Sequence, residues 1–140
     1  MTNKNFKLLR KDKIKIGDHI LSRIKAIKDI ESAGVKKGDL GGYVESENNI
    51  SGNAWVSGNA RVFDNARVFG NAYVCGNAYV CGDAWVFGNA YVCGDAWVFG
   101  NAYVCGDAWV CGDARVFGDA LVYGNAFVFD NEWEFDNISD

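Results

Sequence analysis

Five cysteines are the residues of this 140-residue chain whose type and spacing most readily suggest chemistry. Each follows a valine directly, and they stand at Cys75, Cys81, Cys93, Cys105 and Cys111. Elsewhere the same slot holds Phe, Tyr or Ser, which indicates a packing role for the thiols. No Cys-x-x-Cys pair is present, and a zinc site needs four converging ligands. Because no secretory signal opens the chain, we expect free thiols, and we predict no metal site.

The acids and the single histidine offer few candidates for a catalytic base. His19 lies outside the repeated part of the chain, and we expect it to be a surface or cap residue. The repeated acids occupy a turn slot that they share with asparagine, which indicates a role in the turn. These acids are Asp83, Asp95, Asp107, Asp113 and Asp119. The glycines form no phosphate-binding loop that ends in Lys-Ser or Lys-Thr. We therefore predict no catalytic residue and no cofactor.

A six-residue repeat, Gly-Asn/Asp-Ala-aromatic-Val-x, positions these residues and runs without insertion from Gly52 to Phe135. In an extended strand, Val and the Ala two residues before it point to one side, and the residues flanking Val point to the other. Gly-Asn or Gly-Asp can turn the chain sharply, because these residues tolerate positive φ at low cost. Three such corners close a triangle, so three blocks make one coil, and successive coils stack as parallel strands about 4.8 Å apart.

Blocks such as Val68-Phe69-Gly70-Asn71-Ala72-Tyr73 resemble the hexapeptide-repeat, left-handed β-helix superfamily, whose best-known members are trimeric acyltransferases. The valine phase extends upstream, which predicts an all-β, parallel β-helix of about five 18-residue coils over residues 40–135. The left-handed winding is an implication of the resemblance alone. The acyltransferases use a general base, usually a histidine projecting from the coils, and a long inserted loop. The repeats of this chain have neither, so we do not expect an enzyme.

Residues 1–39 form a basic N-terminal cap, which must cover the open end of the stack. They hold 11 Lys or Arg and five acids, a net charge of +6. The sequence from Arg23 to Glu45 resembles the lead-in of poorly characterised bacterial and phage hexapeptide-repeat proteins, which implies a small β cap. Residues 18–34 also suit a helix that Asp18 could cap, with three isoleucines on one face. Both alternatives remain open.

The far end of the repeat is marked by acids. Glu132 and Glu134 stand in the alanine and valine slots of the last block. A buried, unpaired carboxylate costs on the order of several kcal/mol. We therefore predict that the last good coil ends near Phe129, and that residues 136–140 form an acidic tail which leaves the stack or caps it.

Residues 18 apart lie above one another, so the outward residues sort into three faces. The first face has only aromatic residues before valine and no charged residue in either outward column. A soluble monomer rarely exposes so large an apolar patch, so we predict that this face mediates self-association as a trimer or a dimer. Stacking between coils is the alternative role of its rings. The predicted interface residues are Trp55, Tyr73, Tyr91, Trp109, Phe127, Cys75, Cys93, Cys111 and Phe129.

The net charge is −4, and residues 40–140 alone carry −10. An acidic rod repels phosphate, so we do not expect nucleic acid as a partner. The absence of a signal peptide and of an apolar run of roughly 20 residues favours a cytoplasmic protein without a membrane segment. We predict a non-enzymatic, self-associating β-helical scaffold that binds protein through aromatic faces. There are two alternatives. One is a phage or prophage inhibitor of a host enzyme, which could act as an acidic mimic of nucleic acid. The other is a degenerate acyl- or sugar-transferase.

Overall fold

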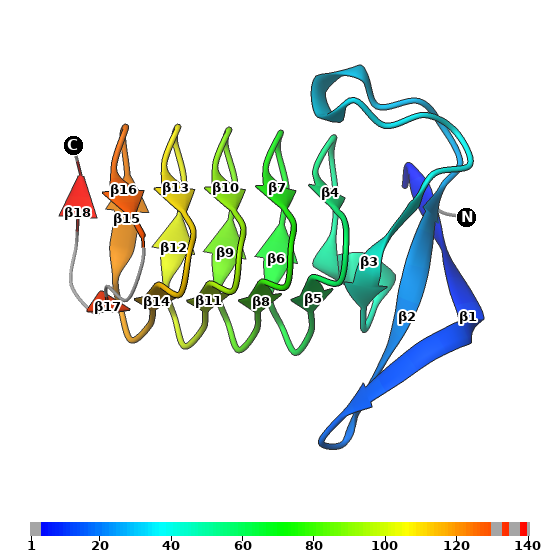
Figure 1. Cartoon of the computed structure of the whole chain (residues 1–140), viewed down its shortest axis with the longest axis horizontal. Helices are drawn as coiled ribbons and strands as arrows, with labels where there is room; N and C mark the ends of the chain where they lie inside the picture. The colour runs from blue at the N-terminus through cyan, green and yellow to red at the C-terminus, as the bar shows by residue number, and fades with distance from the viewer. Residues whose placement is uncertain (1–3, 130–132, 135–137, 140) are drawn as a thin grey trace.

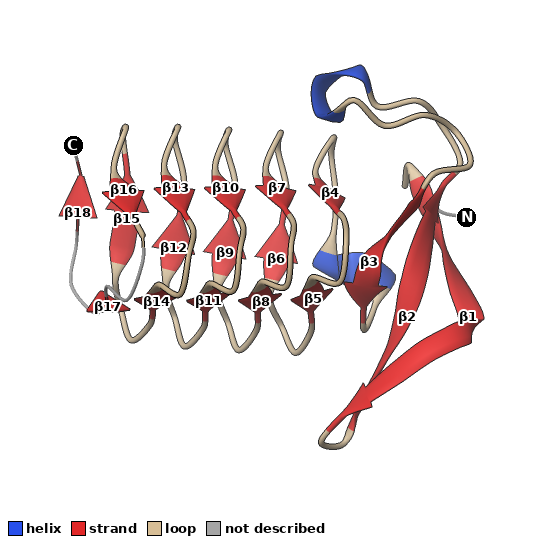
Figure 2. Cartoon of the chain, viewed as in Figure 1, coloured by secondary structure: helices blue, strands red, loops and turns tan. Residues whose placement is uncertain are grey.

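The computed structural model describes residues 4–129, 133–134 and 138–139. They form a rod of stacked coils, with an antiparallel hairpin and a long loop at the N-terminal end (Figure 1). Strands make up nearly all the regular structure, and the described helical turns are two short 3-10 segments, η1 (Glu31–Ala33) and η2 (Glu47–Asn49) (Figure 2). The all-β prediction is confirmed.

Three sheets line the rod, and each takes one short strand from every coil. The first sheet contains β4 (Trp55–Val56), β7 (Tyr73–Val74), β10 (Tyr91–Val92), β13 (Trp109–Val110) and β16 (Phe127–Val128). In the rod, the second contains β3 (Leu40–Val44), β5 (Arg61–Val62), β8 (Tyr79–Val80), β11 (Trp97–Val98), β14 (Arg115–Val116) and β17 (Trp133–Glu134). The third contains β6 (Arg67–Val68), β9 (Trp85–Val86), β12 (Tyr103–Val104), β15 (Leu121–Tyr123) and β18 (Ile138–Ser139). Paired residues lie 18 apart, as Tyr91 with Tyr73 and Trp109. This register confirms a parallel β-solenoid of about five coils.

Valine and alanine fill the interior of the rod. Val92 and Ala90 are fully buried, whereas Tyr91 between them is 36% exposed. Backbone hydrogen bonds join each coil to the next, as in the 2.8 Å bond that the Cys93 N–H donates to the Val110 carbonyl. Burial of one valine stabilises the fold by roughly 1.5–3 kcal/mol. The same small layer is therefore repeated in every coil, and neighbouring coils share its stability.

Glycine at the corners is required by both conformation and space. Gly94 has a φ of +66°, and a Cβ there would lie 2.8 Å from the backbone nitrogen of Gly112 in the next coil. The same corner slot holds glycine in every block from Gly52 to Gly124 except at Asp64, which has a φ of +59°. Asp64 is thus the residue that keeps a side chain at this slot.

The N-terminal segment is a β cap. β1 (Phe6–Ile16) pairs antiparallel with β2 (His19–Ala26), and β2 pairs antiparallel with β3 at the start of the rod. The structure therefore selects the β cap over the helix that residues 18–34 also suited, and only Glu31–Ala33 of that segment is helical. Pairing by β2 satisfies backbone groups along an otherwise open strand edge, which a helix could not do.

Strand pairing continues beyond Phe129, where the sequence predicted the last good coil to end. β17 pairs with β14, and β18 pairs with β15, in the same parallel register. Glu134 pairs with Val116, because backbone pairing between parallel strands does not depend on the residue type. The residues outside the described part are 1–3, 130–132, 135–137 and 140. They include Glu132 and most of the predicted acidic tail at 136–140.

Val92→Asp, in the middle of the rod, is expected to unfold the protein. The substitution places an unpaired carboxylate in a fully buried column, at a cost on the order of several kcal/mol. Val128→Asp is the matched control, because Val128 is equally buried but lies near the end of the stack, where fewer coils depend on it. We expect Val128→Asp to lower the melting temperature less than Val92→Asp does. Melting curves by circular dichroism compare the two, and equal losses would contradict a core that is shared coil by coil.

Candidate functional site

Four aromatic side chains of the first face are exposed on neighbouring coils, and we call them the aromatic patch. They are Tyr91 (36% exposed), Trp109 (41%), Phe129 (47%) and Phe127 (55%). The rings of Tyr91 and Trp109 stack with their centroids 4.9 Å apart and their planes 6° from parallel. Phe127 packs edge-on against Trp109, with centroids 5.5 Å apart. The patch is a continuous row of rings that touch one another and remain open to solvent.

Trp55 is buried, and its prediction as an interface residue is wrong. Its side chain is 1% exposed, because it belongs to the core that also contains Phe6, Ile30 and Val35 of the cap. The long loop that follows β2 lies near β4, the strand that begins with Trp55 (Figure 1). Tyr73, on the next coil, is half-buried and packs against the same core. The exposed part of the first face therefore begins at Tyr91.

The other two faces mix aromatic rings with arginine. On the second face, Trp97 is 37% exposed and stacks on Tyr79 with centroids 4.8 Å apart. The Arg115 guanidinium lies 5.0 Å from the centre of the Trp97 ring. On the third face, Tyr103 is 36% exposed, and Arg67 lies two coils away in the same column. The rings of all three faces are exposed to a similar degree. The first face differs from the other two in that its outward columns hold no charged residue.

All five cysteines are free thiols of intermediate exposure. Cys75, Cys93 and Cys111 form one column of the first face, because each directly follows a strand of the first sheet. Burial raises the pKa of Cys75, and burial together with the two neighbouring thiols raises the pKa of Cys93 to about 12. Thiols with such a raised pKa stay protonated at neutral pH, so we expect low reactivity toward electrophiles.

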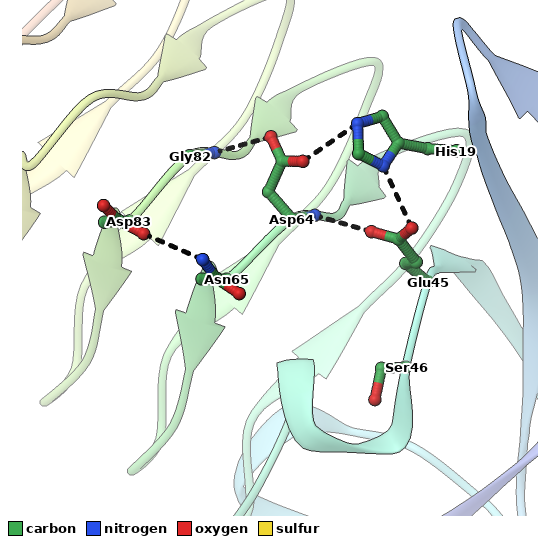
Figure 3. A pocket seen from close by; sticks show the side chains of 7 residues that line it. All are labelled: His19, Glu45, Ser46, Asp64, Asn65, Gly82 and Asp83. Atoms are coloured by element: carbon green, nitrogen blue, oxygen red, sulfur yellow. Dashed lines mark hydrogen bonds and ion pairs between the residues drawn. The ribbon is translucent and has the colours of Figure 1, made fainter.

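A cluster of one histidine and two carboxylates, which no sequence motif indicated, joins the cap to the coils. His19 is the first residue of β2, Glu45 follows β3, and Asp64 follows β5 by two residues. The His19 Nδ1 lies 2.9 Å from Glu45 Oε2, and its Nε2 lies 2.9 Å from Asp64 Oδ1 (Figure 3). The imidazole also packs on the Phe63 ring, with centroids 5.2 Å apart. We call the arrangement of His19, Glu45 and Asp64 the cap clasp.

Backbone N–H groups fix both carboxylates of the cap clasp. The Asp64 N–H donates to Glu45 Oε1 at 2.8 Å, and the Gly82 N–H donates to Asp64 Oδ2 at 3.1 Å (Figure 3). The other oxygen of each carboxylate faces His19. Asp64 reaches this position from a left-handed backbone conformation, which aspartate tolerates better than most residues other than glycine.

The hydrogen bond with Glu45 is the main cause that raises the pKa of His19 above 6.5. Partial burial acts in the opposite direction, and the negative charges of Asp64, Glu45 and Asp18 raise the pKa further. A protonated imidazole donates from both ring nitrogens, whereas a neutral ring donates from one. The cap clasp is therefore complete only when His19 carries its proton.

An open hollow of about 550 Å³ lies beside the cap clasp, and its rim includes Asn65 and Asp83. Ligand atoms of His19, Glu45 and Asp64 lie within 4.8 Å of one another, so these side chains could hold a small cation. Each ring nitrogen of His19 already has a carboxylate partner, so a cation would have to replace one of these contacts. A general base needs a ring nitrogen that is free to accept a proton, and in His19 both ring nitrogens already face a carboxylate.

Asp64 is the one sequence signal that could have pointed to the cap clasp. It replaces glycine in a slot that is otherwise glycine from Gly52 to Gly124, and such a replacement calls for a reason. Its partners could not be found in the same way, because His19 and Glu45 are distant in the chain and belong to no recognisable motif.

His19→Gln is expected to lower the melting temperature more at about pH 5.5 than at about pH 9. The raised pKa of His19 means that the folded protein binds this proton more tightly than the unfolded chain. The resulting stabilisation is present in full below about pH 6.5, the unfolded value, and is lost as the pH rises through the raised value of the folded state. Glutamine can still form hydrogen bonds but never carries the charge. Melting curves of both proteins at the two pH values measure the difference.

Asp64→Asn provides the control for this experiment, because asparagine also tolerates positive φ but has no charge. In an Asp64→Asn background, His19→Gln should have a smaller effect at about pH 5.5, since one partner of the imidazolium is already gone. An effect of His19→Gln that is the same at both pH values would contradict an electrostatic role for the cap clasp.

Two segments, residues 60–76 and 108–124, match the model of a family described as the YdcK beta solenoid repeat. Each segment is about one coil long and lies within the rod. A comparison with curated proteins gives no match. Among the described residues, no helix has the length and apolar character needed to cross a membrane. The family match and the coil geometry agree that the chain is a β-solenoid repeat protein.

Proposed function

We propose that the protein is a β-solenoid scaffold that self-associates through the aromatic patch of its first face. The observation that carries this proposal is the unbroken exposed row formed by Tyr91, Trp109, Phe127 and Phe129, without a charge in either outward column. Contiguous exposed apolar patches are typical of protein contact surfaces. Tyrosine and tryptophan are also among the residues that contribute most to binding energy at such surfaces.

The distribution of charge favours the first face for contact between two copies. Residues 40–140 carry a net charge of −10, so two rods repel each other at long range. Arg61 and Arg115 lie on the second face and Arg67 lies on the third, and burying their charges would cost free energy. Contact through the first face avoids burying an arginine, because neither outward column of that face holds a charged residue.

The first coil supplies an internal example of how this face can be covered. Trp55 stands in the same column as Tyr91 and Trp109, and Phe6 and Ile30 of the cap belong to the core that buries it. No described segment covers the rings of the distal coils in this way. A second copy of the same face offers matching rings for a two-fold contact, whereas the resemblance to trimeric proteins implies three copies.

The cap clasp supports a structural role for the only histidine. Each ring nitrogen of His19 lies 2.9 Å from a carboxylate oxygen, so neither is free to take a proton from a substrate. The blocks from Gly52 to Gly124 also contain no insertion that could build an acceptor pocket. These features support a scaffold that acts by binding protein rather than by catalysis.

Tyr91→Glu combined with Trp109→Glu is expected to convert the associated protein into a monomer. The two carboxylates would lie in the centre of the patch, where contact between copies would force them out of water next to like charges. Gel filtration with multi-angle light scattering measures the mass at a concentration where the native protein is associated. Circular dichroism confirms that the variant is folded.

Trp97→Glu combined with Tyr103→Glu is the matched control. These residues have the same types, equivalent repeat positions and similar exposure, 37% and 36%, but lie on the other two faces. We expect this variant to keep the native mass. Equal dissociation of both variants would contradict the choice of face, and a native protein that is monomeric at every concentration would contradict self-association itself.

A further inference from the structure

The column of three thiols on the first face has no counterpart on the other two faces. Cys75, Cys93 and Cys111 follow one another at intervals of 18 residues. Cys81 on the second face and Cys105 on the third have no cysteine in the coil above or below them, where aromatic residues fill the slot. We infer that the column of Cys75, Cys93 and Cys111 is a binding site for copper(I), which two adjacent thiolates hold between them.

Backbone pairing holds the three cysteines in register. The Cys75 N–H donates to the Val92 carbonyl at 2.9 Å, and the Cys93 N–H donates to the Val110 carbonyl at 2.8 Å. Adjacent strands place these side chains on the same side, roughly 4.8 Å apart. A zinc–thiolate bond is about 2.3 Å long, and with a copper(I)–thiolate bond of similar length an ion on the line between two sulfurs holds them about 4.6 Å apart. The spacing of adjacent strands is therefore close to the span that such an ion requires.

The arrangement of the sulfurs favours copper(I) over zinc. Thiolates are soft ligands, and copper(I) is among the ions that they prefer. Zinc in a structural site needs four ligands at the corners of a tetrahedron, and three sulfurs in a row cannot surround one ion in that way. Copper(I) forms complexes of low coordination number, in which two thiolates on opposite sides of the ion suffice. A disulfide between adjacent cysteines fits this column less well, because the Cα–Cβ bonds of in-register parallel strands point in the same direction.

Binding requires two thiols to lose their protons to solvent, while a lone pair of each sulfur forms the bond to copper and the copper remains in the +1 state. Burial and then the neighbouring thiols raise the pKa of Cys93, because two adjacent thiolates repel each other. A cation between them cancels that repulsion. Copper competes with protons for the sulfurs, so its apparent affinity rises with pH. In a single copy of the chain, the intermediate exposure of all three residues leaves the column within reach of a small ion.

Cys93 is the member that both possible pairs share. An ion binds between Cys93 and Cys75 or between Cys93 and Cys111, since the two outer cysteines are two strands apart and too distant for one ion. Loss of Cys93 therefore removes both pairs. Loss of either outer cysteine leaves one pair intact.

Anaerobic titration of the full chain with copper(I), in competition with a chromophoric copper(I) chelator, tests the inference. Cys93→Ser is expected to bind copper(I) at least about a hundredfold more weakly than the native protein, because a second thiolate on the same scaffold acts at high effective concentration. Cys75→Ser and Cys111→Ser are each expected to retain binding. Cys81→Ser and Cys105→Ser are the matched controls, and we expect both to keep the native affinity.

Serine is a conservative choice for these variants, because Ser57 already occupies the same slot in the first coil. Circular dichroism checks the fold of each. Native protein that takes no copper from the chelator, Cys93→Ser that binds as tightly as the native protein, or an equal loss in all five variants would each overturn the inference. Repeating the titration with the variant that carries Tyr91→Glu and Trp109→Glu separates copper binding from self-association.

Discussion

The backbone hydrogen bonds between coils are the interaction on which the rest of this structure depends. Bonds such as the one from the Trp97 N–H to the Ala114 carbonyl, 3.0 Å long, place each strand one strand spacing from its counterpart 18 residues away. The glycine corners make this approach possible, because a side chain at a position such as Gly94 would meet the backbone of the next coil. Each side chain therefore has as its nearest neighbours the residues that fill its own slot in the coils above and below.

This constraint makes the column the natural unit of the surface. Rings stack on rings in the aromatic patch, and three thiols lie together because their slots coincide. At the corners, asparagine alternates with aspartate in several places, as where the Asn89 amide donates to the Asp107 carboxylate at 3.1 Å. The residue type that recurs at one position of the repeat therefore sets the chemical character of a whole column on that face.

The period of the sequence predicted the sheets and their register well, because every coil repeats the same pattern of Val, Ala and Gly. The cap was less predictable: residues 18–34 suit both a strand and a helix, and the choice depends on pairing with β3. The burial of Trp55 escaped prediction for the same reason, since a segment with no repeat covers it. The three residues of the cap clasp meet only because β2 folds back on the first coils, and no local pattern indicates that contact.

Near-identical repeats can pair out of step by one block without losing the matched valines and alanines of the core. The cap clasp distinguishes the correct alignment from these alternatives. If the first coils shifted by one block relative to β2, Gly58 or Gly70 would stand where Asp64 meets His19, and glycine offers no carboxylate. A single aspartate at a glycine corner thus fixes the register of the coils relative to the cap. In the blocks from Gly52 to Gly124, no other residue in this slot has a carboxylate that could meet His19.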